Sequence, residues 1–195
     1  VLGQTAFFNR EQIMKWVSKA PKDFTIYARN PKYNMFIGGE NTEYAAGYGC
    51  ADIIETNGKR RKALYNDYLN FLKLVHQCNY FNINGGILVQ PMDLDINQSS
   101  LIMIYSTITH SDKCIIGVPA KSYYMQKIMD ILGILFGQKD LMEKPRILTP
   151  VSTTSPLQIS EGTLDEMLIP IKYNQPLLIS PGPLAGATGP ISLGG

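Results

Sequence analysis

Four short apolar segments recur at nearly constant intervals along the C-terminal part of the chain. They cover residues 83–89, 114–118, 146–151 and 177–180, and helical periodicity follows each of the first three. Counted from Asn82, Lys113, Pro145 and Pro176, the steps are 31, 32 and 31 residues. A (β/α)8 barrel of about 250 residues gives each strand–helix unit roughly 31 residues. The spacing therefore predicts an α/β protein with about the first four βα units of a TIM (β/α)8 barrel.

A doubly wound parallel sheet shows the same alternation of strands and helices. Such a sheet more often carries a glycine-rich phosphate turn after its first strand, and residues 83–89 are not followed by one. We therefore favour the barrel. Because four units cannot close a barrel, we expect half of one, with an exposed fourth strand. The absence of an initiator methionine and the ending at Gly194-Gly195 lead us to expect a truncated chain.

The first 81 residues predict a smaller region of a different kind. A helix capped by Asn9 carries an apolar face of Ile13, Trp16 and Val17. Strand-like runs separated by turn residues follow and favour antiparallel pairing, before a second helix at about residues 64–77. These runs cover residues 24–29, 33–37, 44–48 and 52–55. We expect residues 1–81 to pack on a half-barrel formed by residues 82–195.

The charge balance excludes some classes of partner. Charged residues make up 17% of the chain and the net charge is +2, which argues against nucleic acid and against a membrane surface. We find no apolar run of the ~20 residues that a membrane span needs, and no signal peptide. Three scattered cysteines favour a reducing cytoplasm over a disulfide framework. We expect a small molecule or another protein as partner, and a homo-oligomer.

Barrel enzymes place their active sites in the loops after the strands. Here those loops hold hydroxyls, amides, glycines and prolines, and Asp93 is their one acid at a strand end. Paired-carboxylate hydrolysis is therefore disfavoured. Gln90, Thr153 and Thr154 are candidate substrate-binding residues, and the threonines act as hydrogen-bond donors because no base accompanies them.

The two histidines give no catalytic constellation. His76 and His110 both lie near helix ends, where a histidine meets the last carbonyl groups. We therefore favour structural roles for them. Without a His/Cys cluster, we expect no metal site in this chain.

The loop at residues 181–190 contains three prolines and three glycines. Its backbone path is thereby restricted, and glycines allow a bulky ligand to approach the main chain. A rigid linker is the alternative, but loops at strand ends are where barrels place their sites. We assign a ligand-binding role to six of its residues, and the family resemblance described below makes that ligand a cofactor: Gly182, Leu184, Ala185, Gly186, Ala187 and Thr188.

A tyrosine-rich segment, with Tyr44 and Tyr48, lies near Tyr27 and Tyr33 in the sequence. Aromatic faces attract quaternary ammonium groups through cation–π interactions of ~0.5–2 kcal/mol. On base rates alone, packing of a small sheet against the barrel explains these tyrosines better. Binding of an amine by Tyr44 and Tyr48 becomes the stronger hypothesis only when a family resemblance is added.

Segments along nearly the whole chain resemble the trimethylamine/glycine-betaine corrinoid methyltransferase family. The most specific is the loop Leu184-Ala185-Gly186-Ala187-Thr188 before Gly189-Pro190. The other matching segments are residues 20–31, 47–49, 67–72, 85–89, 111–113 and 153–157.

The resemblance implies a TIM-barrel enzyme that moves a methyl group from a methylated amine to a corrinoid (methylcobalamin) carried by a cognate corrinoid protein. The donor would be trimethylamine, glycine betaine or a similar quaternary amine. The reduced corrinoid would be the nucleophile, which agrees with loops lacking acids and bases. We expect this piece alone to be inactive, and a pyrrolysine, if present, to lie in the missing half. Two alternatives stay open: a non-enzymatic quaternary-amine binding module, and a barrel enzyme of other chemistry with catalytic residues elsewhere.

Overall fold

The N-terminal region contains a helix and two antiparallel hairpins in the computed structural model, which describes residues 3, 5–154, 158–180, 182, 185–187, 189 and 191. The helix α1 (Arg10–Val17) begins where the Asn9 side chain accepts a hydrogen bond from the Gln12 backbone, as predicted. The hairpins pair β1 (Asp23–Ile26) with β2 (Met35–Gly38) and β3 (Asp52–Ile54) with β4 (Arg60–Lys62). The predicted strand at residues 44–48 does not form.

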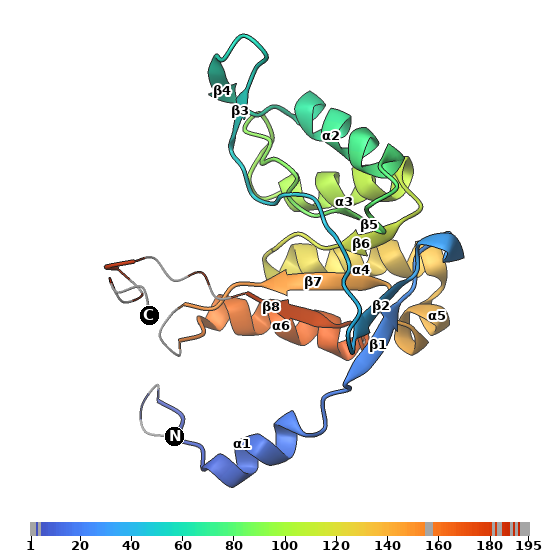
Figure 1. The fold of residues 1–195 in the computed structure, drawn as a ribbon. Helices are drawn as coiled ribbons and strands as arrows, with labels where there is room; N and C mark the ends of the chain where they lie inside the picture. The colour runs from blue at the N-terminus through green and yellow to red at the C-terminus, as the bar shows by residue number, and fades with distance from the viewer. Residues whose placement is uncertain are drawn as a thin grey trace.

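Residues 65–179 alternate between helices and strands. The helices are α2 (Tyr65–Gln77), α3 (Ser99–His110), α4 (Ser122–Phe136), α5 (Gln138–Glu143) and α6 (Glu161–Lys172). The strands are β5 (Ile83–Gly85), β6 (Cys114–Ile116), β7 (Ile147–Val151) and β8 (Leu177–Ile179). They form one parallel sheet in the order β5-β6-β7-β8, the order of the chain (Figure 1). The four strands predicted from the 31-residue spacing are confirmed.

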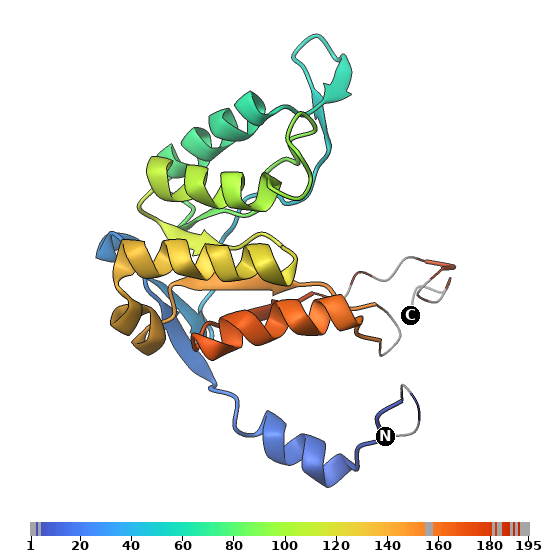
Figure 2. The same ribbon diagram turned by 180° about the vertical axis from the view of Figure 1, so that it is seen from behind.

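The sequential strand order places the connecting helices on one face of the sheet. Parallel strands joined by right-handed crossovers that always step in the same direction carry their helices on the same side. Figure 2 shows α3, α4 and α6 together in front of the strands. A doubly wound sheet would reverse direction at a switch point, and the sheet formed by the described residues does not. Within the same residues the sheet is open, with β5 and β8 as its edges, so a closed barrel is not observed.

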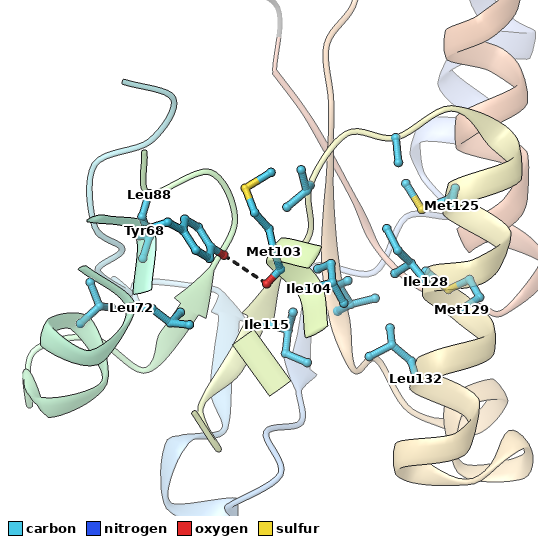
Figure 3. Close-up of a cluster of buried hydrophobic side chains, with 14 of the residues drawn as sticks. Tyr68, Leu72, Leu88, Met103, Ile104, Ile115, Met125, Ile128, Met129 and Leu132 are labelled. Atoms are coloured by element: carbon cyan, nitrogen blue, oxygen red, sulfur yellow. Dashed lines mark hydrogen bonds between the residues drawn. The ribbon is translucent and has the colours of Figure 1, made fainter. Parts of the chain in front are cut away.

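The main core lies between the sheet and its helices. It is formed by buried residues of α2, α3 and α4 against the outward side chains of β6 and β7, for example Ile115 and Ile147. Figure 3 shows the side chains of α2 and α3 meeting those of α4, with the Tyr68 hydroxyl hydrogen-bonded to the Met103 carbonyl. Because α2 shares this core with α3 and α4, the core spans the boundary that we predicted at residue 81, and that boundary stays a prediction.

The β1–β2 hairpin closes the amino ends of β6 and β7. The connection between β1 and β2 donates backbone hydrogen bonds from Tyr27 to the Pro145 carbonyl (2.8 Å) and from Asn30 to the Asp112 carbonyl (3.0 Å). The Arg146 guanidinium, which precedes β7, donates to the carbonyls of Tyr27 and Ala28. A second apolar cluster of hairpin and strand residues fills the space between them. The opposite, carboxyl ends of the strands are therefore the ends available to a ligand.

Lys113 links the end of α2 to the start of β6. It is buried, and its ammonium donates to the carbonyls of Val75 (2.9 Å) and Cys78 (2.7 Å). A cation is favourable at these carbonyls because they carry the negative end of the helix dipole. Burial lowers the pKa of the Lys113 ammonium. In the part of the chain that the structure describes, no helix has the length and apolar composition of a membrane span.

Tyr68 provides a test of how α2 is attached to β5. Its buried hydroxyl lies 3.1 Å from the Gly86 carbonyl, 3.3 Å from the Met103 carbonyl and 3.2 Å from the Thr107 hydroxyl. We expect Tyr68→Phe to lower the free energy of unfolding by about 1–2 kcal/mol, because a buried carbonyl loses its donor. Urea denaturation measures this change. Tyr105→Phe, on an exposed tyrosine of α3, is the control and should cause almost none. Equal midpoints for wild type and Tyr68→Phe would contradict this role.

Asp67 predicts a pH-dependent contribution to stability. Two hydrogen bonds from the Arg61 guanidinium, at 2.6 and 2.8 Å, hold the pKa of its carboxyl below the usual value near 3.8. A lowered carboxyl pKa stabilises the fold above pH 3.8, and this stabilisation is lost as the pH falls through the lowered value. We expect Asp67→Asn to cost about 1 kcal/mol at pH 7.

Urea midpoints measured at pH 7 and at steps down to pH 3 test this expectation. The difference between wild type and Asp67→Asn should shrink as the pH falls. Asp165→Asn, on the exposed face of α6, is the matched control and should show no such trend. A difference that is constant with pH would exclude the ion pair as its cause.

Candidate functional site

Two adjacent glycines end β5 and shape the carboxyl edge of the sheet. Gly85 and Gly86 have φ values of +99° and +69°, a backbone region that favours glycine. A Cβ at Gly85 would lie 2.8 Å from the Thr107 methyl group on α3. A Cβ at Gly86 would lie 2.6 Å from the Tyr48 ring and 2.7 Å from a methyl group of Ile116. The glycines therefore allow close packing on both faces of the sheet.

Tyr48 lies against Gly86, on the face of the sheet opposite α3. The segment that carries it runs beside the continuation of β5, where Gly49 donates to the Ile87 carbonyl (2.6 Å) and Gln90 to the Cys50 carbonyl (2.8 Å). Burial raises the pKa of the Tyr48 phenol to about 12, although a phenol with the usual pKa of 10 is also neutral at physiological pH. Tyr48 is 43% exposed and can present an aromatic surface to a ligand.

The three tyrosines that the sequence analysis grouped with Tyr48 do not form a cluster with it. Tyr44 is 62% exposed, and no described aromatic contact links it to Tyr48. Tyr27 and Tyr33 lie at the amino ends of the strands, where Arg146 and Lys113 approach their rings at 5.9 and 5.1 Å. Their proximity in sequence was therefore misleading, because the β1–β2 hairpin carries them to the opposite end of the sheet. There they bind cations of the protein itself.

The other predicted substrate-binding residues also follow strand ends. Gln90 is half-buried, and its side-chain amide lies 3.5 Å from the Pro91 carbonyl. Thr153 is half-buried and Thr154 exposed, just after β7. The backbones of Thr154 and Gln158 exchange two hydrogen bonds of 3.0 Å, which closes a short loop. Residues 155–157 lie outside the described part of the chain.

The predicted cofactor loop follows β8 and is exposed where it is described. Gly182, Ala185, Gly186 and Ala187 all face solvent. The Gly186 amide donates to the Gly189 carbonyl (3.0 Å), and the Gly186 φ of +77° favours glycine at this turn. Leu184 and Thr188, which we also assigned to this site, lie outside the described residues.

Side chains with acid or base groups near the strand ends have structural partners. Asp93, the acid singled out at a strand end, accepts a hydrogen bond from the Tyr65 backbone (2.8 Å) and so caps α2. His76 and His110 contact the Ser111 hydroxyl and the Ser106 carbonyl, which agrees with structural roles. Among the described residues, no three His, Cys, Asp or Glu side chains come together as metal ligands.

One titratable residue escaped the sequence prediction. Glu166, on α6, lines a cavity beside Lys121, which follows β6, and burial raises the pKa of its carboxyl. Its position within a helix gave no signal, because the prediction considered only residues in the loops after strands. A search for charged residues in the first two turns of the helices would have found it, because helices also begin at this edge of the sheet.

The chain was compared with known proteins. All of it, residues 1–195, matches the family described as Trimethylamine methyltransferase (MTTB). It is 36% identical over 196 residues to the glycine betaine methyltransferase of Desulfitobacterium hafniense (strain Y51), an alignment that covers 100% of this chain. It is 22% identical over 183 residues, 92% of this chain, to the trimethylamine methyltransferase MttB of Desulfitobacterium hafniense (strain DSM 10664 / DCB-2).

The chain spans 41% of the length of the first relative and 36% of the second. The family match covers every segment on which the resemblance was based, and it confirms that resemblance. The chain therefore belongs to the trimethylamine methyltransferase (MTTB) family.

Proposed function

We propose that this protein acts as a methyltransferase that moves a methyl group from a methylated amine to the cobalt of a corrinoid protein. The observation that carries the proposal is the partly exposed Tyr48 ring, held over Gly86 at the carboxyl edge of the sheet. An aromatic face at this position suits a methylated ammonium group. Family membership supplies the reaction class, and the activity of the whole protein is part of the proposal.

We further propose that the four units form half of a (β/α)8 barrel in the full-length protein. The sequential strand order, the helices on one face and the 31-residue spacing support this fold. The hairpin at the amino ends supports a ligand site at the carboxyl ends, which is where barrels bind their substrates. Gln90, Thr153 and Thr154, which also follow strand ends, would then lie around the amine together with Tyr48.

The proposed reaction requires little acid–base chemistry from this chain. The reduced cobalt of the acceptor supplies the nucleophile, and the demethylated amine leaves with the electron pair of its carbon–nitrogen bond. The residues of this chain position the donor and exclude water, which can contribute several kcal/mol to catalysis. The structural roles of Asp93, His76 and His110 agree with this division.

The exposed turn after β8 is the proposed contact for the corrinoid. The small residues Gly182, Ala185, Gly186 and Ala187 fit the flat surface of a macrocycle, since none projects a bulky side chain. Of the two relatives, the glycine betaine methyltransferase has the higher identity to this chain, which favours glycine betaine as the donor to test first.

Replacement of Tyr48 tests the proposed donor site. The full-length protein is mixed with glycine betaine and cobalt(I) cobalamin, and methylation is followed by corrin absorbance. We expect Tyr48→Ala to reduce kcat/KM about 5- to 30-fold, because a cation–π contact is worth about 1–2 kcal/mol. Tyr48→Phe should retain most activity. Tyr80→Ala, on a tyrosine that is 83% exposed, is the control.

An active Tyr48→Ala variant with unchanged kinetics would remove Tyr48 from the site. Failure of every tertiary and quaternary amine to methylate the corrinoid would reject the methyltransferase. Binding of such an amine without transfer would instead favour the alternative of an amine-binding module.

A bulky residue in the turn after β8 tests the corrinoid contact. We expect Ala187→Phe to lower methyl transfer about tenfold or more at limiting corrinoid, because a phenyl ring would block the approach of the macrocycle. Its free energy of unfolding should differ from that of the wild type by less than about 0.5 kcal/mol, since Ala187 is exposed. Ala20→Phe, just after α1, is the matched control. Parallel losses of activity and stability would indicate a linker instead.

A further inference from the structure

A cavity of about 320 Å³ lies on the helix side of the sheet, apart from Tyr48. Its walls come from the segment before α3, the loop after β6, the first turns of α3 and α4, and α6. Tyr48, in contrast, contacts Gly86, at which a side chain would point to the other side of the sheet. The volume is within the range of pockets that hold small molecules.

The N-terminus of α4 opens onto this cavity. It has no side-chain cap and no acidic residue in its first turn, whereas the segment that leads into α3 is capped by Asp95, whose carboxylate accepts from the Asn97 and Gln98 backbones. Within the described residues, the backbone N–H groups of Ser122, Tyr123 and Tyr124 have no hydrogen-bond acceptor. Unpaired N–H groups at a helix start favour a negatively charged group.

Ser100 gives independent support for a polar ligand. It is only 5% exposed, it lines the cavity, and its hydroxyl has no hydrogen-bond partner among the described residues, yet it is not one of the atoms closed off from solvent. The hydroxyl therefore faces the open space of the cavity, where it can donate a hydrogen bond to a polar ligand. Asn97 and Lys121, whose side chains lie 3.2 Å apart, add an amide and an ammonium to the same wall.

The cavity is also lined by a carboxyl group, whose charge is opposite to that of Lys121. Glu166 lines it from α6, and burial raises the pKa of its carboxyl. No ion pair joins Glu166 to Lys121 among the described residues, although both line the same cavity. The Tyr124 ring stands in the same lining and offers an aromatic surface to a cation.

We infer that this cavity binds a small zwitterion, an amino acid or its N-methylated form, as a second ligand site distinct from the Tyr48 site. The carboxylate of the ligand binds Lys121, Ser100 and the N-terminus of α4. Its ammonium group binds Glu166 and the face of Tyr124. A ligand with both charges satisfies Lys121 and Glu166 together, whereas a simple anion would meet the Glu166 carboxylate and a simple cation would meet Lys121.

Calorimetric titration of the protein tests this inference without any methyl acceptor. The probes are glycine and glycine betaine, which carry both charges, and acetate and tetramethylammonium, which carry one each. We expect the two zwitterions to bind and the single-charge probes to bind at least about tenfold more weakly, a loss of roughly 1.4 kcal/mol. Lys121→Gln and Glu166→Gln should each weaken zwitterion binding by about tenfold or more.

The control is Lys127→Gln, which removes a lysine of α4 that pairs with Asp130 and does not line this cavity. It should leave the affinity unchanged, and circular dichroism checks that all variants fold. Acetate binding as tightly as glycine, or no zwitterion binding up to about 10 mM, would overturn the inference. Loss of binding in Tyr48→Ala but not in Lys121→Gln would also overturn it, while supporting the proposed donor site. The methyl-transfer assay is separate, so the two proposals can fail independently.

Discussion

The structure depends on the direction of its crossover connections. Each parallel strand reaches the next through a helix, and each connection steps the same way along the sheet. Right-handed crossovers then require all the helices to lie on one face. That face holds the main core, in which α2, α3 and α4 pack on β6 and β7 (Figure 3). The other face is left for the β1–β2 hairpin at one end and for Tyr48 at the other.

The two ends of the sheet use charged and aromatic residues differently. At the amino ends, Lys113 and Arg146 bind backbone carbonyls and lie over tyrosine rings, so their charges stabilise the fold. At the carboxyl ends, Tyr48 is 43% exposed and the first three backbone N–H groups of α4 have no acceptor among the described residues.

The glycine pair after β5 connects the core to the candidate site. Tyr68 reaches from α2 to the Gly86 carbonyl, and Tyr48 covers the same glycine from the other face. A side chain at either glycine would meet Thr107 or Tyr48 at less than the normal contact distance. The position of Tyr48 is therefore determined by the packing of α2 and α3 as well as by its own segment.

The alternation of strands and helices could be predicted from the sequence alone, as could the spacing of about 31 residues between units and the segments that follow the strands. It could do so because apolar periodicity and turn residues are local properties of the chain. It also indicated structural roles for His76 and His110, since helix ends can be recognised locally.

Which of these segments come into contact depends on the tertiary fold. Tyr27 and Tyr33 are near Tyr48 in sequence, yet the hairpin takes them to the far end of the sheet. From the sequence, Asp93 is an acid at a strand end, but in the fold its carboxylate accepts a hydrogen bond from the Tyr65 backbone at the start of α2. Glu166 and Lys121, 45 positions apart, line one cavity only because α6 packs beside α4. Contacts between distant segments depend on the packing of the whole chain, which local patterns do not encode.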